Sequence, residues 1–559
     1  MKKLCLVLLA FLVLSTGLSS CSLRNSFDIG NKQDNSISSD KNEGDVMDRG
    51  PVNGGVLKLF STIPDTMNPI LTDNVYVHDF LEFVFEGLVK LDSDQRPVPE
   101  LADRWEVSSD GLTWTFYMSD NVSWQDGMPF TAEDAEFTIE TILNAKVNSV
   151  YKKNVDNIAA FTAIDRNILK ITLKKPNSFT AELMTFPIIS KHYFSGEDIN
   201  KSSRNMSPMG TGPYKFLSYD GKNIAKLIVN ENWWKAGPAS KDKQALPYIG
   251  EIDVALYKNG KDALNAFQAR DIDVTFIGAE DFGRYNGRTD VLLKKYTDRS
   301  YDFISINLSN PVLSDKAVRQ ALAYAVDKVG LINNIMPGEA IAADIPVIPD
   351  TWLYNNDVLY YSPSSSKAKE LLVQNGWKED EDTGELYKKI NGVVKTLTLE
   401  MLVNDDNDLR VKVAEEIQRQ LAQAGIKLNI VKTKWDDEFG KINSKKYQLA
   451  LVGLNIPSTE DISFLYASSE IASGTNTAGY NNPDVDNYLK QILAENDDTQ
   501  KKALFYNMRS LINEEVPYIG LYFYNNAILL NKKIRGELSS YFFDKYSGYE
   551  KCYIPVTAR

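Results

Sequence analysis

Histidine and cysteine, which most often bind metals or serve in nucleophilic catalysis, are scarce in this sequence of 559 residues. There are two histidines, His78 and His192, and three cysteines, Cys5, Cys21 and Cys552. A structural zinc site built from these residue types needs four well-spaced ligands, which this set cannot supply. A serine-histidine-aspartate triad would have to use one of only two imidazoles. We therefore expect no metal, no cofactor and no catalytic residue, and we predict that the chain is not an enzyme.

Short motifs for phosphate, calcium and hydrolysis give no positive signal. The GTGP motif at 210–213 begins like a dinucleotide-binding loop, but it lacks the third glycine, and proline has no amide for a phosphate. The acidic stretches 92–94 and 405–408 lack the glycine and glutamate of a calcium loop, which predicts solvated turns. Paired carboxylates such as Glu415 and Glu416 fall on the polar side of a predicted helix. Nothing in the sequence indicates which carboxylates converge for acid/base catalysis.

The first residues have the pattern of an export signal. Lys2 and Lys3 precede an apolar run at 4–14, which is too short to span a membrane and is typical of a signal peptide. The sequence LSSC at 18–21 resembles the lipobox of bacterial lipoproteins, in which the cysteine is acylated and becomes the new N-terminus. We predict a signal peptide at 1–20 and lipidation of Cys21; a soluble secretory signal is the alternative.

Residues 21–53 are rich in Ser, Asn, Asp and Gly and poor in apolar residues, so we expect a flexible tether. The protein would then be exported and anchored by lipid to the outer face of the bacterial cell membrane. From Gly54 onward the composition is that of a globular protein, with 43% apolar and 25% charged residues in the whole chain. The formal net charge of −13 argues against a nucleic-acid partner, because such a protein needs a basic face. We expect a monomer.

Alternating strand and helix patterns predict an α/β fold. Residues 397–403 alternate as a strand, 408–424 carry an apolar helical stripe, and 426–430 alternate again. A strand, a helix and a strand with short links predict a parallel pair with a right-handed crossover. Further predicted elements are strands at 56–60 and 114–118, a helix capped by Ser314 and a helix over 364–374. Sheets of this kind bind ligands at the carboxyl ends of their strands, which locates a site without naming its ligand.

Six ordered motifs carry a resemblance to a known family. They are FEGL at 85–88, PELADRWEVSSDGLT at 99–113, FTAEDA at 130–135, GTGPY at 210–214, VRQAL with AVDK at 318–328 and NTAGYNNPDVD at 476–486. The chain resembles the extracytoplasmic solute-binding lipoproteins of ABC importers, in the family of oligopeptide-, dipeptide- and nickel-binding proteins (bacterial solute-binding protein family 5). The resemblance covers almost the whole chain from Gly54 to about Pro555.

The resemblance implies a periplasmic-binding-protein-like α/β fold with two lobes, mixed sheets and a hinge, plus an additional inserted domain. Domain I would comprise 54–93, 206–297 and 525–559, domain II the inserted 94–205, and domain III, the second lobe, 298–524. Ligand would bind between the lobes and stabilise a closed state that the permease recognises. The implied function is that of the membrane-anchored substrate-binding subunit of an ABC transporter, capturing oligopeptides for import, with the transmembrane permease subunits as partners.

One segment departs from the peptide-binding members, which place an aspartate for the ligand's ammonium before a Phe-Leu pair. Here that position falls on Asn455 or Pro457, and neither is charged. A buried ammonium without a carboxylate is costly. Either the local alignment differs, or Asp461 replaces the usual anchor, or the ligand has no free amino terminus. We predict ligand contacts, with packing or surface roles as the alternative for each, at Asn307, Trp435, Asn455, Asp461, Asn476 and Tyr480.

Other interpretations stay open. The same fold could bind a non-peptide solute, such as an oligosaccharide, a metal chelate or an opine-like compound. The chain could also be an extracellular carboxylate-based hydrolase, or a sensor, adhesin or folding helper that uses the same cleft. Direct metal binding is the least supported of these functions, because the chain has two histidines and no cysteine cluster.

Overall fold

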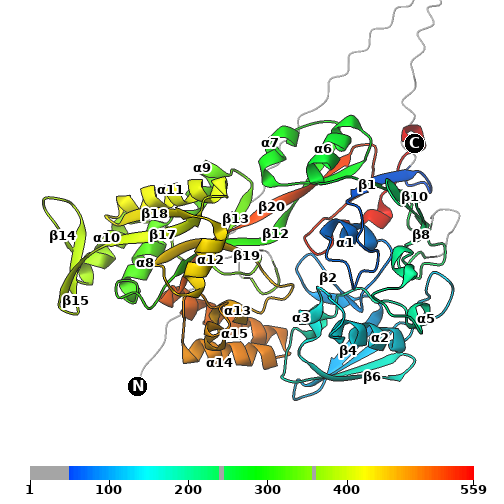
Figure 1. Ribbon diagram of the computed structural model, residues 1–559, viewed down its shortest axis with the longest axis horizontal. Coiled ribbons are helices and arrows are strands. Elements are labelled where there is room, and N and C mark those ends of the chain that lie inside the picture. Colours follow the sequence, from blue (N-terminus) through cyan, green and yellow to red (C-terminus); the bar gives the residue numbers. More distant parts are fainter. Residues whose placement is uncertain (1–49, 238–244, 350, 355–359) are drawn as a thin grey trace, which may run out of the picture. The chain divides into compact units, whose positions relative to one another are not determined.

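The computed structural model describes residues 50–237, 245–349, 351–354 and 360–559 (Figure 1). The predicted signal peptide, Cys21 and all but the last residues of the predicted tether lie outside this part. Within it, no helix combines the length and the apolar character needed to cross a membrane. Mixed sheets and helices form two lobes, which confirms the predicted fold class.

The first sheet has the strand order β1-β10-β9-β8, in which β1 and β10 are parallel and the other pairs are antiparallel. The strand predicted over residues 56–60 is confirmed as β1. The strands are β1 (Val56–Ser61), β8 (Tyr214–Tyr219), β9 (Ile224–Val229) and β10 (Glu251–Leu256). Beside them lie α1 (Val75–Leu81), α6 (Gly260–Ala269), α7 (Phe282–Tyr285) and the β2–β3 pair (Val89–Leu91, Pro97–Pro99).

A second, fully antiparallel sheet is formed by residues of the predicted inserted domain. Its order is β4-β5-β7-β6, with β4 (Ala102–Val107), β5 (Thr113–Met118), β6 (Ile158–Asp165) and β7 (Ile168–Leu173). The helices of this region are α2 (Ala132–Leu143), α3 (Lys152–Val155), α4 (Thr180–Leu183) and α5 (Lys191–Phe194). One hydrophobic core runs through the first two sheets, from Leu59 of β1 to Phe116 of β5. We call these two sheets and their helices the first lobe.

The largest sheet has the order β11-β20-β12-β19-β17-β18, and β13 pairs with β20. Within it, β17 is parallel to both β18 and β19, and α11 connects β17 to β18, so the predicted strand-helix-strand unit is confirmed. The bounds are β11 (Val274–Ile277), β12 (Val291–Ile306), β13 (Ala340–Ala342), β17 (Thr398–Asn404), α11 (Asp408–Gln423), β18 (Lys427–Thr433), β19 (Leu449–Asn455) and β20 (Tyr518–Asn531).

Two long strands connect the cores of the two lobes. β12 and β20 lie side by side (Figure 1), and their register shifts between Thr297 and Tyr301 and again between Asp302 and Phe303. At one end they contribute Leu530 to the core of the first lobe, and at the other Ile304 to the core of the second lobe. Crossing strands with an interrupted ladder suit a hinge. The predicted domain boundaries at 297/298 and 524/525 fall inside these strands, and the exact division stays a prediction.

The remaining helices belong to the second lobe, and one predicted cap is wrong by a residue. The helix expected after Ser314 is α8, whose N-cap is Asp315: its carboxylate accepts from the Ala317 amide at 3.0 Å, while Ser314 bonds to the Pro311 carbonyl instead. Both side chains can cap a helix, so sequence pattern alone did not separate them.

The helices of the second lobe are α8 (Lys316–Ala325), α9 (Lys328–Ile335), α10 (Ser365–Gln374), α12 (Trp435–Asn443), α13 (Ser463–Tyr466), α14 (Pro483–Ala494) and α15 (Asp498–Glu515). A small sheet is formed by β14 (Lys378–Glu379), β15 (Leu386–Ile390) and β16 (Val393–Thr396).

Candidate ligand-binding cavity

A cavity of about 590 Å³ is lined mainly by three groups of residues that are far apart in the sequence, with further contributions from Glu100 and from residues within 150–154, 185–187 and 213–235. The first comprises α1 and the residues up to Leu91, and the second is the C-terminal stretch 542–550. The third contribution comes from the crossing strand β12, through Arg299, and from Ser458, just after β19. A ligand in this cavity would therefore contact the first lobe and the hinge-side end of the second lobe together.

The cavity wall is held by a close approach of two chain segments. The Gly212 amide donates to the Val84 carbonyl at 2.9 Å, and the Tyr214 amide donates to the Phe83 carbonyl at 3.0 Å. A Cβ added at Gly210 would lie 1.9 Å from the Val84 oxygen, so only glycine fits there. The GTGPY motif therefore serves packing in this structure, since it fastens the chain that follows α1.

Aromatic side chains fix the C-terminal stretch against the same wall. The ring of Phe83 packs edge-on against Tyr549 at 4.4 Å between centroids and lies tilted against Tyr546 at 4.8 Å. Such contacts bury large apolar area in defined geometries. These contacts place the neighbouring charged residues Asp544 and Lys545 beside α1.

Three lysines of the wall are each paired with a carboxylate. Lys545 lies 2.7 Å from Asp79, Lys90 lies 2.5 Å from Asp544, and Lys235 lies 2.5 Å from Glu100. Although burial lowers it, the Asp544 carboxylate raises the pKa of Lys90 above its usual value. These lysines are therefore occupied by the protein's own acids.

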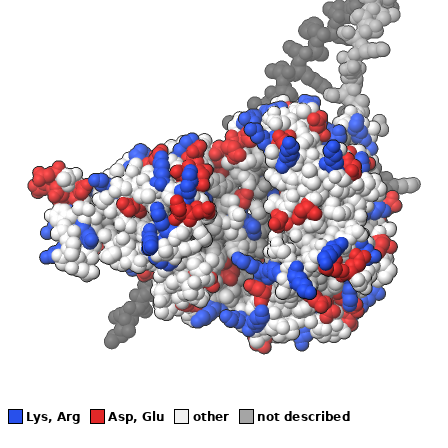
Figure 2. Space-filling model, viewed as in Figure 1, with Lys and Arg blue, Asp and Glu red and all other residues white. Residues whose placement is uncertain are grey.

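Elsewhere, Figure 2 shows lysine, arginine and acidic side chains interspersed over the visible face.

Glu86, from the FEGL motif, is the most hydrogen-bonded carboxylate of the wall. It accepts from the Thr211 hydroxyl at 2.8 Å and from the indoles of Trp234 and Trp233 at 2.9 and 3.2 Å. Burial, together with the Glu100 carboxylate, raises its pKa to about 7. Thr211 belongs to the GTGPY motif, and the two tryptophans follow β9 of the first sheet. The hydrogen bond from Thr211 to Glu86 therefore links the GTGPY and FEGL motifs.

Three charged side chains of the wall, Glu82, Glu550 and Arg299, have no ion-pair partner in the described part of the chain. The exposed Glu82 carboxylate accepts no hydrogen bond there. The surrounding protein atoms, then Asp544 and Asp79, raise its pKa, while Lys545 and Lys90 act in the opposite direction. Arg299 stacks on the ring of Phe542 at 4.9 Å, and its buried Nε has no hydrogen-bond partner. Burial lowers the pKa of Arg299.

Two of the sequence-predicted contacts have their amides fully engaged within the protein. The buried Asn307, just after β12, donates to the carbonyls of Lys445 and Tyr447 at 3.0 and 2.8 Å. The fully buried Asn476 donates to the Ala467 and Tyr480 carbonyls at 3.0 and 2.8 Å. These hydrogen bonds fix loops of the second lobe, and a ligand contact at either residue stays a prediction.

The other four predicted residues do not line the cavity either. Asn455 ends β19 and accepts from the Ser300 hydroxyl at 3.0 Å, which places it beside the strand that carries Arg299. Trp435 begins α12 and stacks on the exposed Phe439 at 6.0 Å. The Asp461 carboxylate accepts from the Ser463 amide at 2.9 Å, and burial raises its pKa. Tyr480 is buried, so it is not open to solvent, and the structure does not bring these four together.

Sequence inspection missed Glu82, Arg299 and the charged residues near the C-terminus. One usable signal existed: Asp79 of α1 and Glu82 at the C-cap of this helix are three residues apart, so they share a face. No local pattern marks Arg299 or the stretch 542–550, because their role depends on segments brought together from both ends of the chain.

A serine, a histidine and an aspartate do form a hydrogen-bonded chain near α5. The Ser190 hydroxyl lies 2.8 Å from His192 Nδ1, and His192 Nε2 lies 2.8 Å from an Asp126 oxygen. Ser190 is fully buried and also accepts from the Tyr193 amide as the helix N-cap. A nucleophile must reach its substrate, so this arrangement does not suit hydrolysis. Among the described residues no group of His, Cys, Asp and Glu could hold a metal ion.

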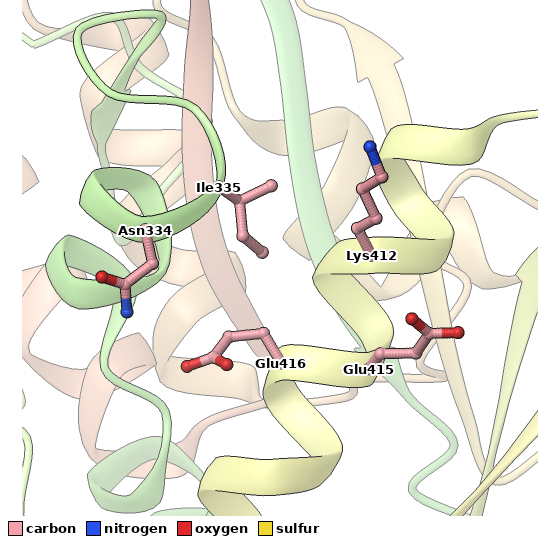
Figure 3. Close-up of a pocket in the computed structure, with 5 residues that line it drawn as sticks. All are labelled: Asn334, Ile335, Lys412, Glu415 and Glu416. Atoms are coloured by element: carbon pink, nitrogen blue, oxygen red, sulfur yellow. The ribbon is translucent and has the colours of Figure 1, made fainter.

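A second hollow, of about 440 Å³, lies between α9 and α11 (Figure 3). Asn334 and Ile335 face it from one helix, and Lys412, Glu415 and Glu416 face it from the other. Glu415 pairs with Lys432 at 3.2 Å and Glu416 with Arg419 at 2.5 Å. Its acids are satisfied by surface partners, so the cavity at Glu82 is the better candidate site.

A protein-family model matches more than half of the chain. The family model described as bacterial extracellular solute-binding proteins, family 5 Middle, matches residues 96–476. The chain belongs to this family. The resemblance inferred from the six motifs is thus confirmed, and the protein is an extracellular solute-binding protein by family.

Relatives of this solute-binding protein differ in what their names say they bind. The oligopeptide-binding protein AppA of Bacillus subtilis is 26% identical over 556 residues, which is 96% of each chain. The structure of NikZ from Campylobacter jejuni, in complex with Ni(L-His), is 25% identical with a TM-score of 0.63 and covers 89% of this chain and 99% of that one. HbpA2 from Haemophilus parasuis shares the fold, with 21% identity and a TM-score of 0.76 over 90% of this chain and all of that one.

Proposed function

We propose that this family 5 protein is the substrate-binding subunit of an ABC importer and that it captures oligopeptides in the cavity at Glu82. The observation that carries the proposal is the composition of the cavity wall. It joins α1 and the C-terminal stretch of the first lobe to Arg299 on the crossing strand β12 and to Ser458 beyond β19. A ligand that contacts both sides stabilises the state in which they are close, which is how a hinged binding protein couples capture to closure.

A peptide is the favoured solute for two reasons. The relative that matches 96% of this chain is named as an oligopeptide-binding protein. The cavity also presents both acidic and basic side chains together with aromatic rings, which suits a ligand with charged and apolar parts. The six contacts predicted in the second lobe, Asn307 to Tyr480, stay predictions, and peptide capture in this cavity does not depend on them.

Membrane attachment completes the proposed function. Acylation of Cys21 would hold the protein at the outer face of the cell membrane, near its permease, with residues 21–53 as the tether. Replacing Cys21 with alanine should release the protein from the membrane fraction into the soluble fraction. Retention of the Cys21→Ala protein in the membrane would contradict lipid anchoring.

The experiment for the ligand class is direct. The purified protein is denatured, and the released small molecules are identified by mass spectrometry. Intact peptides are expected, because a transport protein hands its ligand on unchanged. Release of a sugar or a metal chelate instead would contradict peptide capture, and steady cleavage of added peptides would indicate a hydrolase. A thermal shift provides a second readout, since a ligand at one hundred times its Kd adds about 2.7 kcal/mol of stability.

A further inference from the structure

The internal pairing of charges leaves two acids, Glu82 and Glu550, and one base, Arg299, without an ion-pair partner among the described residues of the cavity wall. Lys545, Lys90 and Lys235 are each within 2.7 Å of a carboxylate, so none of them needs a ligand for charge balance. Glu82 and Arg299 have no such partner among the described residues. Both line the same cavity. The buried Nε of Arg299 has no hydrogen-bond partner, which is costly, and an anionic ligand group would remove that cost. Glu82 is exposed, so a cationic ligand group can reach it.

The acidic side of the cavity is concentrated around the end of α1. Glu82 directly follows the helix, and Asp79 lies one turn earlier on the same face. One oxygen of the buried Asp79 pairs with Lys545, while the other has no hydrogen-bond partner. Asp544 and Asp79 act on Glu82 together with their partners Lys90 and Lys545, so three carboxylates here face two lysines, and the remaining negative charge favours a cation.

The basic side is supplied by the crossing strand. Arg299 lies on β12 inside the register shift between Thr297 and Tyr301, and its carbonyl accepts from the Ile456 amide at 3.0 Å. Phe542 covers one face of the guanidinium, which orients it. A guanidinium is the side chain best suited to a carboxylate, because it can form two parallel hydrogen bonds.

We propose that the cavity selects a dipolar ligand, with Glu82 taking its cationic group and Arg299 its anionic group. This deepens the proposed function and rests on it, since it assigns the charge pattern of the captured solute. An oligopeptide with free termini or charged side chains meets the requirement, and so does a carboxyalkylated amino acid. Neither a polyamine nor a dicarboxylic acid meets it, because each satisfies one side of the cavity and leaves the other unpaired.

The assignment also connects recognition to closure. Glu82 belongs to the first lobe, whereas Arg299 lies on the hinge strand and is tied to the start of the loop after β19. A dipolar ligand that bridges the two would favour the conformation that brings them together. A ligand with a single charge would bind one wall and leave the hinge free.

The test is a competitive capture experiment with the full-length protein. The probe is a defined mixture of short casein peptides, carboxyalkylated amino acids, spermidine, dicarboxylic acids and neutral oligosaccharides. Unbound compounds are removed by filtration, the protein is denatured, and the released compounds are measured by mass spectrometry. The variants are Glu82→Gln and Arg299→Gln, with Glu514→Gln and Arg419→Gln as controls because these two residues are exposed in the second lobe. Melting curves confirm that each variant is folded.

We expect the unmodified protein and both controls to retain dipolar compounds. Each cavity variant should retain at least about tenfold less of these compounds than the unmodified protein. Dipolar amino acids retained in place of peptides, and lost in the variants, would support the charge assignment and overturn the peptide proposal. Peptides retained equally by all five proteins would overturn the charge assignment and leave the peptide proposal standing. Retention of spermidine, dicarboxylic acids or neutral sugars would contradict the charge assignment, and no retention at all would contradict both.

Discussion

The cavity at Glu82 and the contact between α4 and the second lobe both gather carboxylates and lysines, but they treat them differently. In the cavity each lysine has its own carboxylate within 2.7 Å, and the side chains of Lys90 and Lys235 are 44% and 32% exposed. At the contact, Glu182 of α4, Glu460 and Lys501 of α15 are all almost fully buried. One oxygen of each glutamate there has no hydrogen-bond partner. An open site can keep its charges at low cost, while the buried contact keeps them at the expense of stability.

Several direct bonds hold that contact together. The Ser178 hydroxyl donates to the Ile492 carbonyl at 2.8 Å, and the Ser178 amide donates to Leu493 at 2.7 Å. Arg96 pairs with Asp498 at 2.7 Å. Burial raises the pKa of Glu182 to about 7, and burial, with Glu182 close by, raises the pKa of Glu460 well above its usual value. The predicted inserted domain therefore meets the second lobe through buried carboxylates, of which Glu182 changes its charge near neutral pH.

The largest effect is expected when the buried cation is removed. Lys501→Met leaves Glu182 and Glu460 without their nearest positive charge, which should cost about 3–5 kcal/mol of unfolding free energy at pH 8. Denaturant titration measures it. The neighbouring Lys502→Met, at an exposed position, is the control. A loss below 1 kcal/mol for Lys501→Met would show that the buried charges are already compensated.

A smaller gain of stability is expected when one of the acids is neutralised. The folded protein holds the Glu182 proton more tightly than the unfolded chain does, so stability falls as the pH rises from about 4.5 to about 7 and then levels off. Glu182→Gln should therefore raise the unfolding free energy by up to about 3 kcal/mol above pH 7 and change it little below pH 4.5. Unfolding curves between pH 4 and 8 check this. A variant whose advantage does not vary with pH would contradict the assigned titration.

In the cavity, removing a lysine should matter less. The Lys90 side chain is 44% exposed in its pair with Asp544, so solvent screens the interaction. Lys90→Met is expected to cost less than about 1 kcal/mol of unfolding free energy. The same denaturant titration compares it with Lys501→Met. Equal losses for the two variants would remove the distinction between an open and a buried charge cluster.

The smallest effect is expected at the anchor suggested by the family resemblance. Asp461 does not line the cavity and already accepts a hydrogen bond from Ser463. Asp461→Asn should therefore change the amount of retained peptide by less than about twofold, against tenfold for Glu82→Gln. The capture assay measures both. If the Asp461→Asn protein no longer retains peptides with a free amino terminus but still retains N-acetylated peptides, Asp461 is the ammonium anchor after all.

The sequence predicted the fold better than the site, and particular residues explain why. The strand-helix-strand unit from β17 to β18 follows local periodicity, and the GTGPY motif reflects a close backbone approach that admits only glycine at Gly210. Both leave a trace within a few residues. The cavity depends on Glu82, Arg299 and Asp544, which are separated by hundreds of residues and meet only because β12 and the C-terminal stretch fold back on α1. Asn307 and Asn476 looked like free amides in the sequence, but the second lobe uses them to fix its own loops.

The most direct measurement is a crystal structure of the protein with the solute that it retains from the capture mixture. We expect a dipolar ligand in the cavity, with its cationic group at Glu82 and its anionic group at Arg299, in contact with both the first lobe and the crossing strand. A ligand bound outside this cavity, or one that contacts neither of these two side chains, would contradict it.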